Sequence, residues 1–208
     1  MKKSKKITYI FMTIFISSIF ICMVYSLETP TFGNQIDLVG GKWNLISIPK
    51  ELADSSVDNL FESDDKVYYY NSDTSSWEKR SHGLGILINL NLLDGYWVYP
   101  SESKTINLTY KTMDPANPCM PTSKDLVAGW NMIGYSGLQD RRIDLALKSI
   151  DGKYDLIKKY VGESSTLPET DSEGYLIYNV TGEKDFNKLE SGVGYWINIT
   201  ETCTYYEV

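Results

Sequence analysis

The sequence predicts a mainly β protein with short helices, built from two tandem homologous β-rich modules. Two observations predict this fold class. The phrase G-K-W-N-L-I at 41–46 returns as A-G-W-N-M-I at 128–133, and G-Y-W-V at 95–98 returns as G-Y-W-I at 194–197. Short runs of Tyr, Ile and Val alternate with Gly, Asn, Asp and Ser, which are typical turn residues. A repeated phrase of this kind indicates two copies of one structural unit.

The first 27 residues predict export. Four lysines lie among the first six residues, and residues 7–27 carry no charge. A signal peptide over residues 1–26, cleaved after Ser26, fits this pattern. An uncleaved membrane anchor over residues 7–27 also fits, because this stretch could span a bilayer core of about 30 Å. Either places the remainder outside, so we expect an extracellular or cell-surface location, with membrane contact only through this segment.

The exported part is strongly acidic. The chain has 20 Lys and Arg against 27 Asp and Glu, and four of the basic residues belong to the N-terminal segment. Phosphate backbones are bound by clustered Lys and Arg, and the only dense basic cluster is the N-terminal one. We therefore expect no nucleic-acid partner.

The repeats divide the rest of the chain. Repeat 1 occupies residues 38–112 and is preceded by a short polar lead. A Pro-rich linker occupies 113–122, and repeat 2 occupies 123–208. A unit of this size buries only about 60% of its unfolded surface and is marginal alone. We therefore expect the two repeats to pack together, and the duplication allows a pseudo-two-fold arrangement.

Each repeat opens with a strand, at 43–48 in the first. Its two faces are both largely apolar, which favours a strand that is covered on both sides. Ser47 and its counterpart Gly134 are small, as expected where another segment packs closely. We interpret Trp43 and Trp130, at the starts of these strands, as core residues.

A short helix of about two turns follows in each repeat. In the first, Ser55 or Ser56 is the expected cap of a helix that carries Val57, Leu60 and Phe61. In the second, Ile143, Leu147 and Ile150 recur at helical spacing.

The remaining elements are β structure. Residues 66–70 predict a Tyr-rich strand that turns at 71–74 and returns through Trp77, and residues 154–160 are the looser match in the second repeat. An apolar turn is expected before each G-Y-W strand, carrying Leu87 and Leu90 or Phe186 and Leu189. The final strands are expected at 105–110 and 202–208.

Export would allow two covalent modifications, a disulfide and N-glycosylation. The two cysteines beyond the signal, Cys119 and Cys203, predict one disulfide across the second repeat, with two free thiols as the alternative. Three N-x-[ST] sequons make Asn107, Asn179 and Asn198 candidates for glycosylation.

Catalytic residue sets are not recognisable. The single histidine, His82, lies in a Ser-Gly-rich loop with no G-x-S-x-G motif, and no close His or Cys spacing predicts a zinc site. Paired carboxylates cannot be located from the sequence alone. The spacing of Asn71, Asp73 and Ser75 with Glu78 allows calcium, but an ordinary hairpin turn explains it better. We expect no cofactor and no enzymatic activity.

Aromatic residues are the remaining candidates. The chain has 16 Tyr and five Trp, and exposed rings can stack on sugars or act as hot spots for protein partners. Core packing explains most of them. The candidate binding aromatics are Trp97, Trp196, Tyr68, Tyr70 and Trp77.

The L-V-x-G-W-N-L-I-S-I-P opening and the G-Y-W closing resemble a tandem repeat of secreted and cell-surface proteins of archaea, methanogens especially, and of some bacteria. The resemblance covers both halves. It implies an extracellular or envelope-associated β-rich module without an assigned activity, and it supplies no functional residues. Lys42 departs from the pattern because it is inserted between Gly41 and Trp43.

These features together predict an exported cell-surface protein that acts in structure, adhesion or interaction, with a cell-surface protein or a glycan as partner. The alternative is a carbohydrate-binding module, favoured by the Tyr and Trp content. A glycan- or peptide-processing hydrolase is the third hypothesis.

Overall fold

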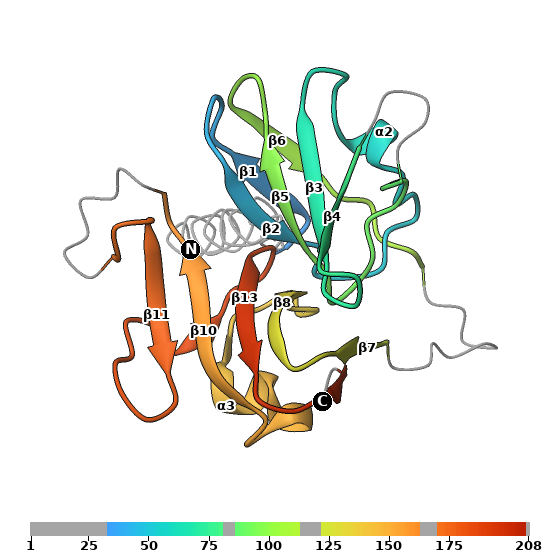
Figure 1. The fold of residues 1–208 in the computed structure, drawn as a ribbon. Helices are drawn as coiled ribbons and strands as arrows, with labels where there is room; N and C mark the ends of the chain where they lie inside the picture. Colours follow the sequence, from blue (N-terminus) through green and yellow to red (C-terminus); the bar gives the residue numbers. More distant parts are fainter. Residues whose placement is uncertain (1–32, 81–85, 113–121, 163–169, 207–208) are drawn as a thin grey trace, which may run out of the picture. The chain divides into compact units, whose positions relative to one another are not determined.

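The computed structural model describes residues 33–80, 86–112, 122–162 and 170–206. All of them belong to one compact unit, Phe32–Val208 (Figure 1). The predicted signal peptide or anchor and nearly all of the predicted linker lie outside the described residues. Within the described ranges, no helix is long and apolar enough to cross a membrane.

Two four-stranded antiparallel sheets form the body of this unit. The first has the order β2 (Asn44–Ser47), β5 (Gly95–Tyr99), β3 (Lys66–Asn71), β4 (Ser76–Lys79). The second has the order β8 (Gly129–Gly134), β13 (Gly194–Ile199), β10 (Tyr154–Tyr160), β11 (Tyr175–Asn179). Register is also shared, since Leu45 pairs with Trp97 and Met132 pairs with Trp196. The predicted mainly β fold with two similar modules is confirmed.

A two-stranded ribbon accompanies each sheet. The ribbons are β1 (Gln35–Leu38) with β6 (Lys104–Asn107), and β7 (Ser123–Leu126) with β14 (Cys203–Tyr206). The Asp37 carboxylate accepts a 2.6 Å hydrogen bond from the Thr105 hydroxyl, and Asp125 accepts a 2.8 Å bond from Thr204. The first module therefore begins at Gln35, within the stretch that the sequence suggested was only a polar lead.

The helices are shorter than predicted. They are α2 (Val57–Leu60), α3 (Ile143–Ala146) and the 3₁₀ turn η1 (Lys148–Ile150). The predicted side-chain cap of α2 is wrong, because the Ser56 side chain makes no cap hydrogen bond. The Ser56 N–H instead donates to the Asp54 carboxylate at 2.9 Å. The helix ends after Leu60 because Phe61 is already extended, with φ −125° and ψ 147°.

The segments before the G-Y-W strands form short β pairings. In the second module β9 (Arg141–Arg142) pairs with β12 (Lys188–Leu189), and in the first Ser56 bridges to Asn89. Leu87, Leu90 and Leu189 are buried as expected, whereas Phe186 is only partly buried and Ile86 and Ile88 are exposed.

Each sheet covers its own core with one face. Tyr96 and Val98 point into the first core and Tyr195 and Ile197 into the second, because alternate residues of a strand point to the same face. Partly buried Leu92 packs against both cores. Tyr96 and Tyr195 are fully buried, and their hydroxyls accept hydrogen bonds of 2.6 and 2.7 Å from backbone N–H groups five residues earlier.

The two modules contact each other through reciprocal backbone hydrogen bonds. The Ser47 N–H donates to the Gly192 carbonyl at 2.9 Å, and the Gly134 N–H donates to the Leu93 carbonyl at 2.8 Å. Ser47 and Gly134 occupy equivalent positions, as do Leu93 and Gly192. The modules are therefore related by an approximate two-fold axis at this contact.

Small residues are required where the modules meet. A Cβ on Gly134 would lie 2.5 Å from the Asp94 carbonyl oxygen and 2.7 Å from the Ser47 Cβ. A Cβ on Gly194 would lie 2.6 Å from the Ile46 carbonyl oxygen. The prediction that Ser47 and Gly134 stay small because another segment packs closely is confirmed.

The asparagine of the W-N phrase, which is present in both copies, fixes the turn before each opening strand. The Asn44 Oδ1 accepts from the Val39 N–H at 3.0 Å, and the Asn131 Oδ1 accepts from the Val127 N–H at 3.1 Å. Each amide also donates back to the carbonyl of the same valine. Asn44 also donates to the Lys42 carbonyl at 2.9 Å, as Asn131 does to the Gly129 carbonyl, so the turn with the inserted Lys42 keeps the same bonds.

Candidate binding surface

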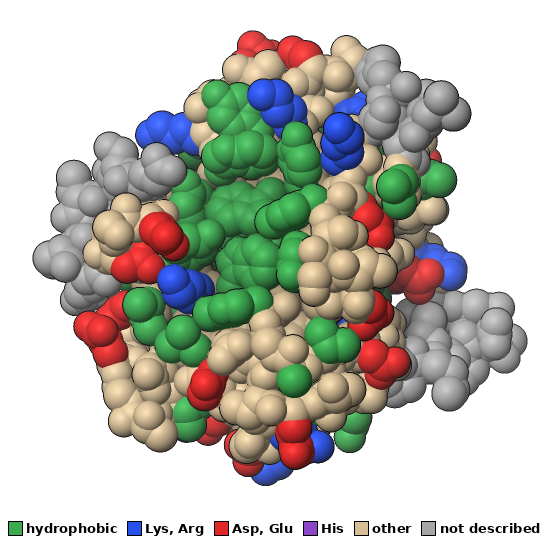
Figure 2. Space-filling view, viewed as in Figure 1, with side chains coloured by type: hydrophobic (Ala, Val, Ile, Leu, Met, Phe, Trp, Pro, Cys, Tyr) green, Lys and Arg blue, Asp and Glu red, His purple; other side chains and the backbone are tan. Residues whose placement is uncertain are grey.

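All five tryptophans lie on one surface of the molecule. Together with five tyrosines they form the aromatic surface, which we define as Trp43, Tyr68, Tyr70, Trp77, Trp97, Tyr99, Trp130, Tyr160, Tyr175 and Trp196. Neighbouring ring centroids are between 4.7 and 6.5 Å apart, within the range of favourable aromatic contacts. Figure 2 shows a continuous hydrophobic patch on this side of the molecule, with basic and acidic side chains at its border.

Strand alternation explains why these rings share a face. In the G-Y-W strand β5, Tyr96 points into the core, so Gly95 and Trp97 point to the opposite face. Part of that face is covered by the other module at Gly95, and the rest carries Trp97. The three residues of the G-Y-W phrase thus have separate roles. The glycine contacts the other module, the tyrosine packs in the core and the tryptophan belongs to the aromatic surface.

The two modules interlock through equivalent aromatic pairs. The ring of Trp97 lies 4.7 Å from Tyr160 of the second module, and Trp196 lies 5.2 Å from Tyr70 of the first. Tyr70 and Tyr160 occupy equivalent positions on β3 and β10. The aromatic surface therefore straddles the approximate two-fold axis, and neither module forms it alone.

The prediction that Trp43 and Trp130 are core residues is wrong. Their exposed fractions are 38% and 40%, and each lies edge-on to another tryptophan of the aromatic surface. The partner module covers only the far ends of these opening strands, at Ser47 and Gly134, and leaves their beginnings open. Sequence periodicity could not reveal where that cover stops.

The five candidate binding aromatics come together as one group. Trp77 is the most exposed ring, at 49%, while Trp97, Trp196, Tyr68 and Tyr70 are half-buried. Sequence reasoning did not single out Trp43, Tyr99, Trp130, Tyr160 and Tyr175 as surface residues. Most of them could have been found, because alternate residues of the paired strands share a face with Trp97 and Trp196.

Two pockets indent the aromatic surface. One has a volume of about 570 Å³ and is lined by Trp43, Tyr68, Trp77, Trp97, Tyr160, Glu173 and Tyr175. The other, of about 400 Å³, is lined by Tyr70, Trp130, Lys158, Glu173, Tyr175 and Trp196. Glu173 and Tyr175 line both, so the pockets are neighbours. The lining rings meet at steep angles, such as 72° for Trp97 with Tyr160, and form walls.

The aromatic surface contains charged groups at a position where the two modules carry different residues. Lys158 stands where the first module has Tyr68, and its Nζ lies 5.1 Å from the Tyr175 ring centroid. The Lys158 ammonium also donates to the Asp171 carboxylate at 3.2 Å. Burial opposes ionisation of Asp171, but the Tyr175 N–H and Lys158 outweigh it and lower the Asp171 pKa. Burial and Glu173 raise the pKa of Tyr175 to about 12.

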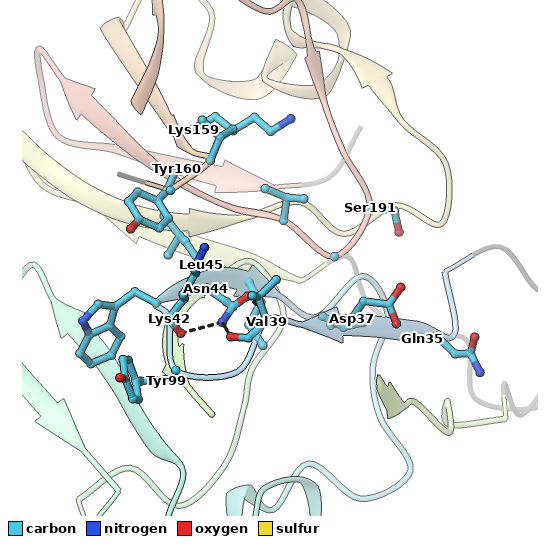
Figure 3. A pocket seen from close by; sticks show the side chains of 18 residues that line it. Gln35, Asp37, Val39, Lys42, Asn44, Leu45, Tyr99, Lys159, Tyr160 and Ser191 are labelled. Carbon is cyan, nitrogen blue, oxygen red and sulfur yellow. Dashed lines mark hydrogen bonds between the residues drawn. The ribbon is translucent and has the colours of Figure 1, made fainter. Parts of the chain in front are cut away.

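A third pocket, of about 760 Å³, adjoins the aromatic surface between the modules. Figure 3 shows Tyr99 and Tyr160 at one end of it and Gln35 and Ser191 at the other. Lys159 lines it, and its Nζ forms a 2.6 Å ion pair with Glu190.

A buried ion pair joins the modules on the other side of the axis. The Lys124 ammonium donates to the Asp94 carboxylate and, at 3.0 Å, to the Tyr69 hydroxyl. Burial disfavours the ammonium ion, but Asp94 and Tyr69 outweigh burial and raise the Lys124 pKa. The equivalent positions hold Ile36 and Val193, which both line the third pocket, so apolar residues stand on that side where the ion pair stands on this one.

The three sequon asparagines lie on strands near the edges of the fold. Asn107 is exposed and its Oδ1 accepts from Gln35 at 2.8 Å, while the Asn179 Oδ1 accepts from the Thr181 N–H at 3.0 Å. The Asn198 Nδ2 donates to Asp155 at 2.8 Å, beside the aromatic surface. Their glycosylation stays a prediction.

The predicted disulfide also stays a prediction. Cys203 lies at the start of β14 and is not bonded to any described cysteine, but Cys119 falls outside the described residues. Burial raises the pKa of the Cys203 thiol. His82 likewise falls outside the described residues.

The candidate calcium ligands belong to a hairpin turn. The Asn71 Oδ1 accepts from the N–H groups of Asp73 and Thr74, and its Nδ2 donates to Glu78 at 2.9 Å. Over the described ranges, no group of three or more His, Cys, Asp or Glu side chains could hold a metal ion.

Comparison of the chain with protein-family models, with curated proteins and with solved structures finds no match. The resemblance to the archaeal surface repeat therefore stays a prediction.

Proposed function

We propose that the protein is an exported cell-surface binding module, acting in adhesion or partner recognition, and that the aromatic surface holds its ligand. The observation that carries the proposal is a contiguous surface of ten aromatic rings, of which Trp43, Trp77 and Trp130 are exposed and the other seven are half-buried. Soluble proteins rarely leave large contiguous apolar patches open unless the patch is a site of interaction. Tryptophan and tyrosine are also the residues most enriched in binding hot spots.

The arrangement of the rings supports binding rather than mere exposure. Edge-to-face packing on rigid sheets holds each ring in place, so little conformational entropy is lost when a ligand binds. The surface also needs both modules. The packing of the two modules therefore matters for function as well as for stability, because it creates the aromatic surface.

A carbohydrate-binding module is the second candidate, and the pockets favour it. Their walls are Trp and Tyr rings, and the few polar groups at their edges include the carboxylate of Glu173 and the ammonium of Lys158. A sugar ring presents apolar C–H faces and polar hydroxyl edges. Pockets that combine apolar walls with a few placed polar groups are suited to such a ligand.

The test is the binding of labelled protein to a glycan array and to separated cell-envelope proteins. Trp77→Ala should abolish most binding, because Trp77 is the most exposed ring of the surface. Tyr206→Ala is the matched control, since Tyr206 is 46% exposed but lies outside the aromatic surface. Full binding by Trp77→Ala and Trp130→Ala proteins would contradict the proposal, provided that both unfold at the wild-type temperature.

A further inference from the structure

We infer that the aromatic surface binds an acidic polysaccharide, with lysines of the first module contacting its carboxylates. The inference rests on the proposed function and names the chemistry of the ligand. It is carried by the distribution of charge around the rings.

Lysines gather on the aromatic face of an otherwise acidic protein. Lys66 and Lys79 both point to the face of Tyr68, because Lys66 precedes Tyr68 by two residues and Lys79 pairs with it across the strands. Lys66 places its Nζ 5.1 Å from the Tyr99 ring centroid. Lys42 precedes Trp43 and lines the neighbouring pocket with it. The chain as a whole has 27 acidic and 20 basic residues, so the first-module part of this face departs from the average, while Glu173 of the second module is an acidic group at the pockets.

These three lysines are available to a ligand. Lys42, Lys66 and Lys79 are exposed, and none forms an ion pair with a residue in the described part of the chain. Lys158 and Lys159, in the second module, are already paired with acids. An anionic group of the ligand is therefore expected over the first module.

The spacing of the exposed rings suits a chain rather than a small molecule. Trp43, Trp77 and Trp130 are the three exposed tryptophans, and one further ring separates each from the next. Two neighbouring pockets lie along this path. Consecutive sugar units can occupy them while their acidic groups reach the lysines.

An acidic polysaccharide fits this face better than a single-stranded nucleic acid. Nucleic-acid grooves follow the phosphate backbone with many basic groups, and they commonly add arginine. Here the free cations are three lysines, and they lie at one end of the rings. The sugar rings of such a chain match the aromatic walls, and the carboxylates of the units over the first module match the three lysines.

The experiment measures binding of the full exported chain to oligogalacturonate, to a neutral xylo-oligosaccharide and to oligo(dT), using tryptophan fluorescence. We expect oligogalacturonate to bind most tightly. Lys66→Gln with Lys79→Gln should weaken that binding roughly 3- to 10-fold, as two exposed charge pairs would. The matched control is Lys148→Gln with Lys188→Gln, two exposed lysines that do not line the surface, and it should bind as the wild type does.

The possible results separate this inference from the proposed function. If the xylo-oligosaccharide binds as tightly as the acidic one and the Lys66 and Lys79 changes have no effect, the acidic ligand is wrong but the proposed function stands. Tighter binding of oligo(dT) than of either saccharide would also overturn the inference. If Trp77→Ala leaves all binding intact, both proposals fail.

Discussion

At the residue scale, the contact between Asp94 and Lys124 is a sensitive point of the fold. Both side chains are about one-tenth exposed, at 11% and 12%, so removal of either one leaves the other charge buried without its counter-ion. Asp94→Ala should lower the free energy of unfolding by about 3–5 kcal/mol for this reason. Urea denaturation followed by circular dichroism measures the change.

The other side of the two-fold axis supplies the compensating variant. Val193 and Ile36 occupy the equivalent positions, so Asp94→Val with Lys124→Ile introduces the two apolar residues that the fold already carries there. We expect the double variant to recover most of the lost stability. A double variant as unstable as Asp94→Ala would show that the ion pair itself is required.

The raised pKa of Lys124 predicts a pH dependence. Its ammonium form is favoured in the folded state, so its contribution to stability is complete below the unfolded value of 10.5 and is lost as pH rises through the folded pKa. Between pH 8 and pH 11, the stability of the wild type relative to the double variant should therefore fall once the pH passes about 10.5. Denaturation series at pH 8 and pH 11 would measure it.

The two repeated asparagines should contribute unequally. Asn131 is fully buried and Asn44 is half-buried, although both hold the N–H and C=O of a valine. Asn131→Ala should cost about 1–3 kcal/mol, and Asn44→Ala less, because water can reach the groups it leaves unpaired. Equal losses in thermal denaturation would contradict this reading of the W-N phrase.

At the element scale, the contact between β8 and β13 of one module and β2 and β5 of the other depends on glycine. Gly194→Ala would place a methyl group 2.6 Å from the Ile46 carbonyl, so the strands must move apart. We expect a loss of about 1–3 kcal/mol, typical of overpacking. Gly182→Ala is the control, since its nearest neighbour would be 3.4 Å away, and it should change stability by less than about 0.5 kcal/mol.

The sequence predicted most of the individual strands, but it did not predict which residues the two modules cover in each other. The repeated phrases located the opening and G-Y-W strands, and the small Ser47 and Gly134 indicated a close approach. The end of the partner module's cover cannot be inferred from alternation, because it depends on how two sheets meet in space. Trp43 and Trp130 were misplaced for that reason, and the joining of aromatic rings from both modules was not foreseen.

At the scale of the whole molecule, the two modules should unfold as one. They share backbone hydrogen bonds, a buried ion pair and aromatic pairs across the axis. Hydrogen–deuterium exchange should give similar protection for the cores around Tyr96 and Tyr195. Two cores that open with clearly different free energies would contradict this expectation.

The central claim is that rings from both modules form one binding surface. Its most direct test is a titration of the protein with oligogalacturonate, and separately with a xylo-oligosaccharide, following the five indole N–H signals by NMR. We predict that the signals of Trp77 from the first module and Trp196 from the second shift together with a single dissociation constant. Shifts confined to one module, or binding of either saccharide without any indole shift, would contradict the account.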